Sequence, residues 1–335
     1  MLRSTLIVLT IGACAASLIA SRTTRRASGD ETQKTTDQQV DAGEAKRLDV
    51  NLPIGNVVLV ADGSKELSVH AVRSARGEKD EWSQKWLRDS YLTVENRDGV
   101  LTVWDHPFGR DSLKDEAKGG HDNGRNLELR VEIHAPNSLS AKLAVTAGKA
   151  LVRGEFQSVD AALTAGEMIY EANCREKAAL HVGAGALAAH FTKEMGSPSI
   201  LRMGAGEVIV SVPSGGDADI SADVTIGEIK GLPPREKPRN EMRLGDKRSG
   251  RLGRGGARVD IHVATGSAEI RSAETPQSVS LSPLLAEPGD NSDDGALDLD
   301  ETIDGAVSKS LQEAMKALGS IHTGSRLDGE PGASI

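Results

Sequence analysis

The chain has 335 residues, a formal net charge of −9, and only three Trp, two Tyr and three Phe. This length suits one or two domains, and so few aromatic residues argue against a conventional core of large side chains. The 36 glycines fit a β protein with many corners, and two cysteines, Cys14 and Cys174, exclude a disulfide framework.

Residues 1–26 are predicted to be an export signal, a lipoprotein signal or a membrane anchor, because an apolar run extends from Leu6 to Ala20. The tetrapeptide IGAC, which ends at Cys14, resembles a bacterial lipobox, in which this cysteine is lipidated and becomes the mature N-terminus. We expect export, with the body held outside the cytoplasm at the membrane. In the alternative, an uncleaved anchor followed by Arg22, Arg25 and Arg26 favours a body in the cytoplasm.

The next segments predict a linker and then a cap. Residues 27–45 are polar and lack periodicity, as in a linker between membrane and body. Residues 81–87 place Trp82, Trp86 and Leu87 on one helical face. Residues 91–104 alternate as a hairpin around an Asn-Arg-Asp-Gly turn. Five of the eight aromatic residues lie between residues 82 and 108, which suits an N-terminal hairpin and helix cap.

A glycine-centred repeat dominates residues 46–272. Apolar residues stand three and one before each glycine, and two and four after it, with Thr265 and Gly231 as the weaker positions. Spacing of two is typical of strands, and glycine permits a corner between them. The sequence therefore predicts an all-β fold, a single-stranded β-solenoid with about twenty residues per coil and small inward side chains. The repeated glycines are Gly55, Gly148, Gly166, Gly185, Gly206, Gly227 and Gly266.

The repeat ends in GRGGARVDIHVATGSAEI, residues 253–270. A Gly-centred strand repeat that follows a signal sequence and closes in this way resembles the putative-adhesin family of β-strand-repeat proteins, a domain of unknown function. The resemblance covers about residues 46–272 and implies an exported, non-catalytic solenoid with no catalytic residues. The motif HVGAGALA at residues 181–188, which looks like a dinucleotide fingerprint, is in register with the other coils and is interpreted as scaffold.

Residues 232–258 are interpreted as a basic insertion loop with nine cations against three anions. Such a loop could hold phosphate headgroups, acidic glycans or nucleic acid, but it has no aromatic residues for base stacking, which argues against nucleic acid. The alternative is a solvated flexible loop. The cations are Arg235, Lys237, Arg239, Arg243, Lys247, Arg248, Arg251, Arg254 and Arg258, and the anions are Glu236, Glu241 and Asp246.

The tail, residues 273–335, contains a pattern that resembles the twelve-position calcium loop of an EF-hand. Its predicted Ca²⁺ ligands are Asp290, Ser292, Asp294, Ala296 through its carbonyl, Asp298 and Glu301. Residues 301–318 carry apolar side chains at helical spacing, which predicts a short exiting helix. However, Pro288 and Gly289 interrupt an entering helix. The alternative is an acidic disordered tail.

Taken with the scattered histidines, which argue against zinc, these features predict a non-catalytic cell-envelope protein for adhesion, scaffolding or envelope sensing. Its partner would be an envelope protein or an acidic glycan. One alternative is a polysaccharide-active parallel β-helix enzyme, which requires clustered carboxylates on one face. The other is a regulatory partner in envelope-stress signalling.

Overall fold

The computed structural model describes residues 22–28, 31–76, 81–106, 126–137, 139–191, 197–213, 216–233 and 245–273. Nearly all of this part is β-strand, and its single helix is α1 (Glu81–Asp89). The prediction of an all-β fold is confirmed. Within the same ranges, no helix is both long enough and apolar enough to cross a membrane.

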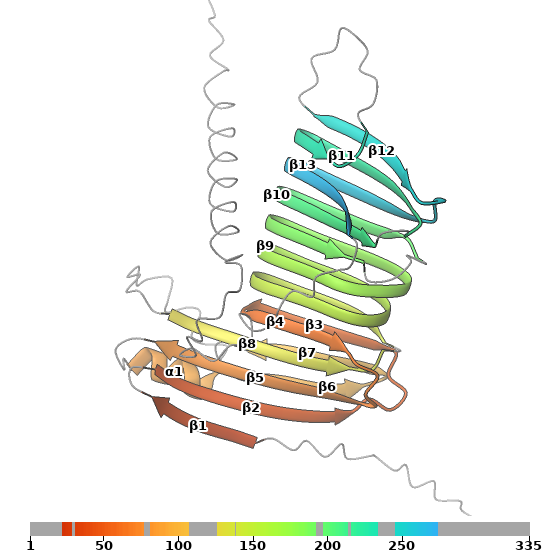
Figure 1. Cartoon of the computed structure of the whole chain (residues 1–335). Helices are drawn as coiled ribbons and strands as arrows, with labels where there is room; N and C mark the ends of the chain where they lie inside the picture. The colour runs from red at the N-terminus through yellow and green to blue at the C-terminus, as the bar shows by residue number, and fades with distance from the viewer. Residues whose placement is uncertain are drawn as a thin grey trace, which may run out of the picture.

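The N-terminal end of the sheet is an antiparallel set of strands that is visible at the bottom of Figure 1. Each of these strands pairs with the next in the order β1, β2, β5 and β8. The antiparallel strands are β1 (Arg22–Ser28), β2 (Glu31–Asp41), β5 (Glu66–Arg76) and β8 (Asn126–Ala135).

Strand β2 forms where the sequence analysis expects a linker. Its inward positions are occupied by Thr32, Thr36 and Val40, which are buried. Between them, Lys34 Nζ donates to the carbonyl oxygen of Ser90 at 2.8 Å, and Gln38 Nε2 donates to that of Leu92 at 3.2 Å. The strand has the usual period of two, but all its inward side chains except Val40 are polar, and Lys34 and Gln38 donate to backbone carbonyls, so no hydrophobic periodicity marks it.

A second branch contains the predicted hairpin, which is confirmed. Strands β6 (Tyr91–Arg97) and β7 (Val100–His106) pair in antiparallel fashion. Asp98 and Gly99 between them have φ values of 52° and 76°, and two consecutive positive φ values are typical of a type I′ hairpin turn. On its other side, β7 pairs in parallel with β3 (Arg47–Ile54).

Strands that pair mainly in parallel form the rest of the sheet and stack as successive layers in Figure 1. The exception is β12, which pairs with β11 in antiparallel fashion. The last strand of the described residues, β13, lies between β10 and β11 and pairs in parallel with both. The remaining strands are β4 (Asn56–Ala61), β9 (Ser140–His190), β10 (Ser199–Pro213), β11 (Ala218–Lys230), β12 (Asp246–Leu252) and β13 (Ala257–Ala273).

The repeated glycines form one continuous ladder through the parallel strands. A Cβ added at any member after the first would come within 3.0 Å of the carbonyl oxygen of the preceding member. Their φ values lie between +131° and +149°, which L side chains rarely adopt. Both facts restrict these corners to glycine. Along the stack the order is Gly55, Gly148, Gly166, Gly185, Gly206, Gly266 and Gly227.

Three of the four apolar positions of the repeat face the core as predicted. The residues three before, two after and four after the glycine are buried in every coil, except Gly231. The residue one before the glycine does not face inward: Ile54 is 61% exposed and Ile226 is 40% exposed. That part of the prediction is wrong. The positions three before and two after the glycine both face inward although they are five residues apart, an odd number, because the chain bends at the glycine. The same bend turns the residue before the glycine outward.

The cap encloses two buried contacts. Trp86 and Leu87 of α1 pack against Ala75 of β5, as their helical spacing predicts. The side chain of Trp82 is outside the described part of the structure. In addition, the guanidinium of Arg73 on β5 forms a buried ion pair with the carboxylate of Asp105 on β7. Burial raises the pKa of Asp105, and the charge of Arg73 offsets part of this effect.

Candidate binding surface

The outer face of the β6–β7 hairpin carries three aromatic rings. Alternation along the two strands buries Leu92 and Val103 and turns Tyr91, Trp104 and His106 outward. We call these three residues the aromatic cluster. The His106 ring stacks on Tyr91 with centroids 4.5 Å apart and on Trp104 with centroids 5.5 Å apart.

The aromatic cluster is half-exposed despite its internal stacking. Tyr91 is 52% exposed and Trp104 is 49% exposed. The other exposed large hydrophobic residues in the described ranges, Ile54 and Ile226, stand singly at glycine corners. Scattered apolar residues are usual on protein surfaces, whereas grouped ones mark sites of interaction.

The strands hold this cluster firmly. Strand β7 is hydrogen-bonded to β6 on one side and to β3 on the other, so Trp104 lies between Thr93 and Asn51 in register. The rings offer apolar faces, and the Tyr91 hydroxyl, the Trp104 Nε1–H and the His106 ring nitrogens offer polar contacts. This combination suits recognition of a sugar ring or of an apolar protein side chain.

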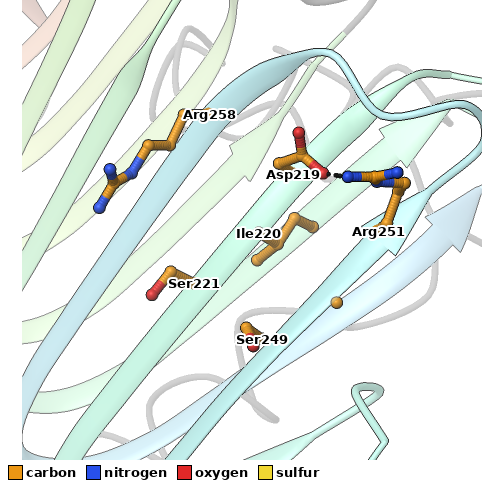
Figure 2. A pocket seen from close by; sticks show the side chains of 7 residues that line it. Asp219, Ile220, Ser221, Ser249, Arg251 and Arg258 are labelled. Atoms are coloured by element: carbon orange, nitrogen blue, oxygen red, sulfur yellow. Dashed lines mark hydrogen bonds and ion pairs between the residues drawn. The ribbon is translucent and has the colours of Figure 1, made fainter.

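A second candidate lies at the far end of the parallel strands. A shallow depression of about 520 Å³ lies over β11, β12 and β13, and Figure 2 shows the side chains that line it. In this depression, Asp219 on β11 stands in register with Arg251 on β12 and Arg258 on β13. Arg251 Nε lies 3.0 Å from Asp219 Oδ1, while Arg258 Nε lies 2.8 Å from Asp260 Oδ2.

The described cations of residues 232–258 are all paired with carboxylates, which reduces their capacity to attract an anion. Arg235, Lys237, Arg239 and Arg243 lie outside the described residues, and part of the predicted loop is instead strand β12. The remaining pairs are Lys247 with Asp223 at 2.9 Å, Arg248 with Asp246 at 2.7 Å, and Arg254 with Asp217 at 3.0 Å.

One histidine lies between two carboxylates near the β4–β5 connection. His134 Nδ1 is 2.7 Å from Asp62 Oδ2, and its Nε2 is 2.8 Å from Glu132 Oε1. Burial of the ring favours its neutral form, but the two carboxylates outweigh this effect and raise the pKa of His134. The pKa of Asp62 is lowered, since its hydrogen bonds to Ser64 and His134 outweigh its partial burial.

Comparisons with known proteins give only distant likenesses. No family model matches the chain, and no curated protein matches it. Among solved structures, a putative cell adhesion protein from Clostridium sporogenes is 15% identical, with a TM-score of 0.38, over 72% of this chain and 100% of that protein. A putative adhesin from Parabacteroides distasonis is 10% identical, with a TM-score of 0.30, over 71% of this chain and 97% of that protein.

A putative adhesin from Bacteroides fragilis is 11% identical, with a TM-score of 0.26, over 71% of this chain and 97% of that protein. At identities of 15% or less and TM-scores below 0.5, these likenesses assign neither a family nor a function to the chain.

The sequence-predicted calcium ligands, Asp290 to Glu301, and the predicted lipidation site, Cys14, lie outside the described residues. In the part of the chain that the structure covers, no three His, Cys, Asp or Glu side chains form a group that could hold a metal ion. Cys174 is buried and free. Gly185, which belongs to the motif at residues 181–188 that looks like a dinucleotide fingerprint, stacks between Gly166 and Gly206 within a strand.

The sequence pattern predicts that these aromatic residues belong to a cap and does not by itself mark the cluster as a binding surface. The signal for it was present in the alternation of the hairpin. Residues of β7 at even positions (Val100, Thr102, Trp104 and His106) share one side, and the residues between them are the more apolar set. Period-two alternation therefore places Trp104 outside and Val103 inside.

Proposed function

We propose that this chain is a non-catalytic binding and scaffolding protein of the cell envelope. In this proposal the parallel strands form a β-solenoid that serves as a rigid support, and the aromatic cluster on the β6–β7 hairpin is the contact surface. Its partner is an envelope protein or an acidic glycan.

The half-exposed aromatic cluster is the observation that carries the proposal. One of its rings, Trp104, stands on a strand with paired neighbours on both sides, so binding costs little ordering of the backbone there. Aromatic side chains account for a large share of binding energy at interfaces. The stack offers apolar area that the flanking Thr93 and Asn51 do not.

The test measures binding of the full chain to purified acidic envelope polysaccharide by co-sedimentation, and to membrane-fraction proteins by cross-linking. Trp104→Ala should weaken binding of the specific partner roughly 30-fold in Kd, which corresponds to a loss of about 2 kcal/mol at an interface. Ile54→Ala is the matched control, because Ile54 is 61% exposed but stands outside the cluster. If Trp104→Ala binds as tightly as the unaltered chain, the cluster is not the contact surface.

Attachment through residues 1–26 and calcium binding by residues 290–301 belong to the same proposal and are supported by the sequence patterns alone. Mass spectrometry of the membrane-extracted protein tests the first by locating the N-terminus and any lipid on Cys14. Calcium titration of the full chain, followed by backbone NMR, tests the second. The absence of any shift at millimolar calcium would exclude the site.

A further inference from the structure

The outer side of the strands that follow the glycine corners carries a continuous row of apolar residues. Each of them stands three positions after a ladder glycine. Register pairs Val58 with Leu151 and Ala188 with Ile209, and the stacked glycines align the coils between them. We call this set the outer apolar row. It consists of Val58, Leu151, Ile169, Ala188 and Ile209.

These residues point away from the core. Their neighbours on either side, such as Val57 and Leu59 or Ala150 and Val152, all belong to the main core cluster. Val58 and Leu151 do not belong to that cluster, yet they are only 2% and 0% exposed. Outward side chains on a free sheet surface should remain accessible to water.

The strands that precede the corners show the contrast. Their outward residues are exposed through the same coils, and most are polar or charged. They include Asn51, Lys142, Asp160, His181, Arg202 and His262. One outer side of the molecule therefore has the character of a free surface. On the other side, the outer apolar row is fully buried at Val58 and Leu151 and partly buried at Ile169, Ala188 and Ile209.

The row is bounded by charge. On its flank, Arg153 and Glu171 pair at 2.5 Å, with the Glu171 side chain only 8% exposed. At the far end, the equivalent positions in β13 and β11 are Glu269 and Lys230. The apolar row thus runs over five successive layers of the stack, from β4 through three passes of β9 to β10, or about 19 Å at the usual spacing between strands.

We propose that the outer apolar row is the docking surface for residues 301–318 of the same chain, lying along the stack as an amphipathic helix. The described chain ends at Ala273, which pairs with Pro213 at the border of this surface. About 27 further residues separate that point from residue 301, enough to reach up to about 90 Å.

The dimensions and pattern of this segment fit the row. Eighteen helical residues extend about 27 Å, which covers the length of the row. Its apolar positions recur at helical spacing and would face the row, with the polar positions turned to water. The apolar positions are Ile303, Val307, Leu311, Ala314, Met315 and Leu318. This docking is independent of the aromatic cluster, which lies on the other outer side.

Hydrogen-exchange mass spectrometry on the full chain tests the proposal with a matched pair of variants on β10. Ile209→Glu places a charge in the row, whereas Ile200→Glu places the same charge on the opposite outer side of the same strand. Amides of residues 301–318 should exchange about tenfold or more slowly than in an unstructured peptide. This protection should persist in Ile200→Glu and disappear in Ile209→Glu.

A variant in the tail keeps the test decisive if Ile209→Glu unfolds the strands. Leu311→Glu leaves the sheet unaltered and should raise hydroxyl-radical labelling of Leu151 severalfold, whereas Gln312→Glu should not. Unprotected amides at 301–318 in the unaltered chain would overturn the proposal. So would protection that depends on protein concentration, because a second copy would then be the occupant. Unchanged labelling of Leu151 in Leu311→Glu would overturn it as well.

Discussion

Replacing Asp105 by alanine should cost more stability than most substitutions in this protein. Asp105 is the carboxylate partner of Arg73, whose side chain is fully buried between β5 and β7. Even with Asp105 in place, Arg73 Nε and Nη1 have no hydrogen-bond partner. The Asp105→Ala variant therefore leaves a charged guanidinium in the cap without its compensating charge.

The magnitude follows from this geometry. Removing one partner of a buried ion pair typically costs about 3–5 kcal/mol, a large part of the 5–15 kcal/mol that stabilises a typical domain. The intact Arg73–Asp105 pair contributes far less to the free energy of unfolding than the loss of one partner costs. Burial raises the pKa of Asp105 even with Arg73 beside it, so the carboxylate is less favourable here than in water. Arg73→Met combined with Asp105→Leu should then match or exceed the unaltered protein.

Urea unfolding followed by circular dichroism measures these differences from the midpoint, provided that the slope with urea is unchanged. Asp160→Ala is the control, since Asp160 is exposed and surface substitutions usually change stability by less than about 0.5 kcal/mol. A free energy of unfolding for Asp105→Ala within about 1 kcal/mol of that of the unaltered protein would contradict this prediction. The prediction also fails if the double variant is no more stable than the single one.

Three further outcomes are expected. Gly185→Ala should lower the free energy of unfolding by more than about 3 kcal/mol, because the added Cβ would collide with the carbonyl oxygen of Gly166. Gly43→Ala, whose Cβ would meet no atom within 4 Å, should cost only about 1–2 kcal/mol through backbone strain. Equal losses in the two variants would contradict the glycine ladder. His134→Gln should lower stability below the unfolded pKa of 6.5, by less than about 1 kcal/mol for a partly exposed pair. This loss should fade as pH rises through the raised folded pKa, and a loss that is constant from about pH 5 to 9 would contradict the assignment.

Much of the parallel part of the fold was predictable because the repeat combines two strong signals. Strand periodicity identified the buried positions on each side of the glycine, and only glycine fits the corner. The position before the glycine was misread, since Ile54 and Ile226 are apolar and sequence alone does not show which way a corner turns a side chain. Strand β2 escaped notice because most of its inward side chains are polar, among them Lys34 and Gln38, which donate to backbone carbonyls.

The candidate surface was harder to predict than the scaffold. Alternation places Trp104 outside, but an outward aromatic residue becomes a cluster only through register with a second strand, which brings Tyr91 opposite His106. The ion pairs over β11 and β12 likewise depend on the pairing of two strands. Asp219 and Arg251 are far apart in sequence and meet because β11 and β12 pair. Local patterns carry no information on such pairing.

The position of β13 has a consequence for the order of assembly during synthesis. Strands β10 and β11 leave the ribosome before β13, yet each of them pairs with β13 in the finished sheet. Until residues 257–273 emerge, β10 lacks one neighbour and the β11–β12 hairpin has no parallel strand on which to dock. Two open edges therefore face each other in the nascent chain, and such edges readily pair with other chains. Completion of the parallel stack therefore waits for residues 257–273, close to the end of the described chain.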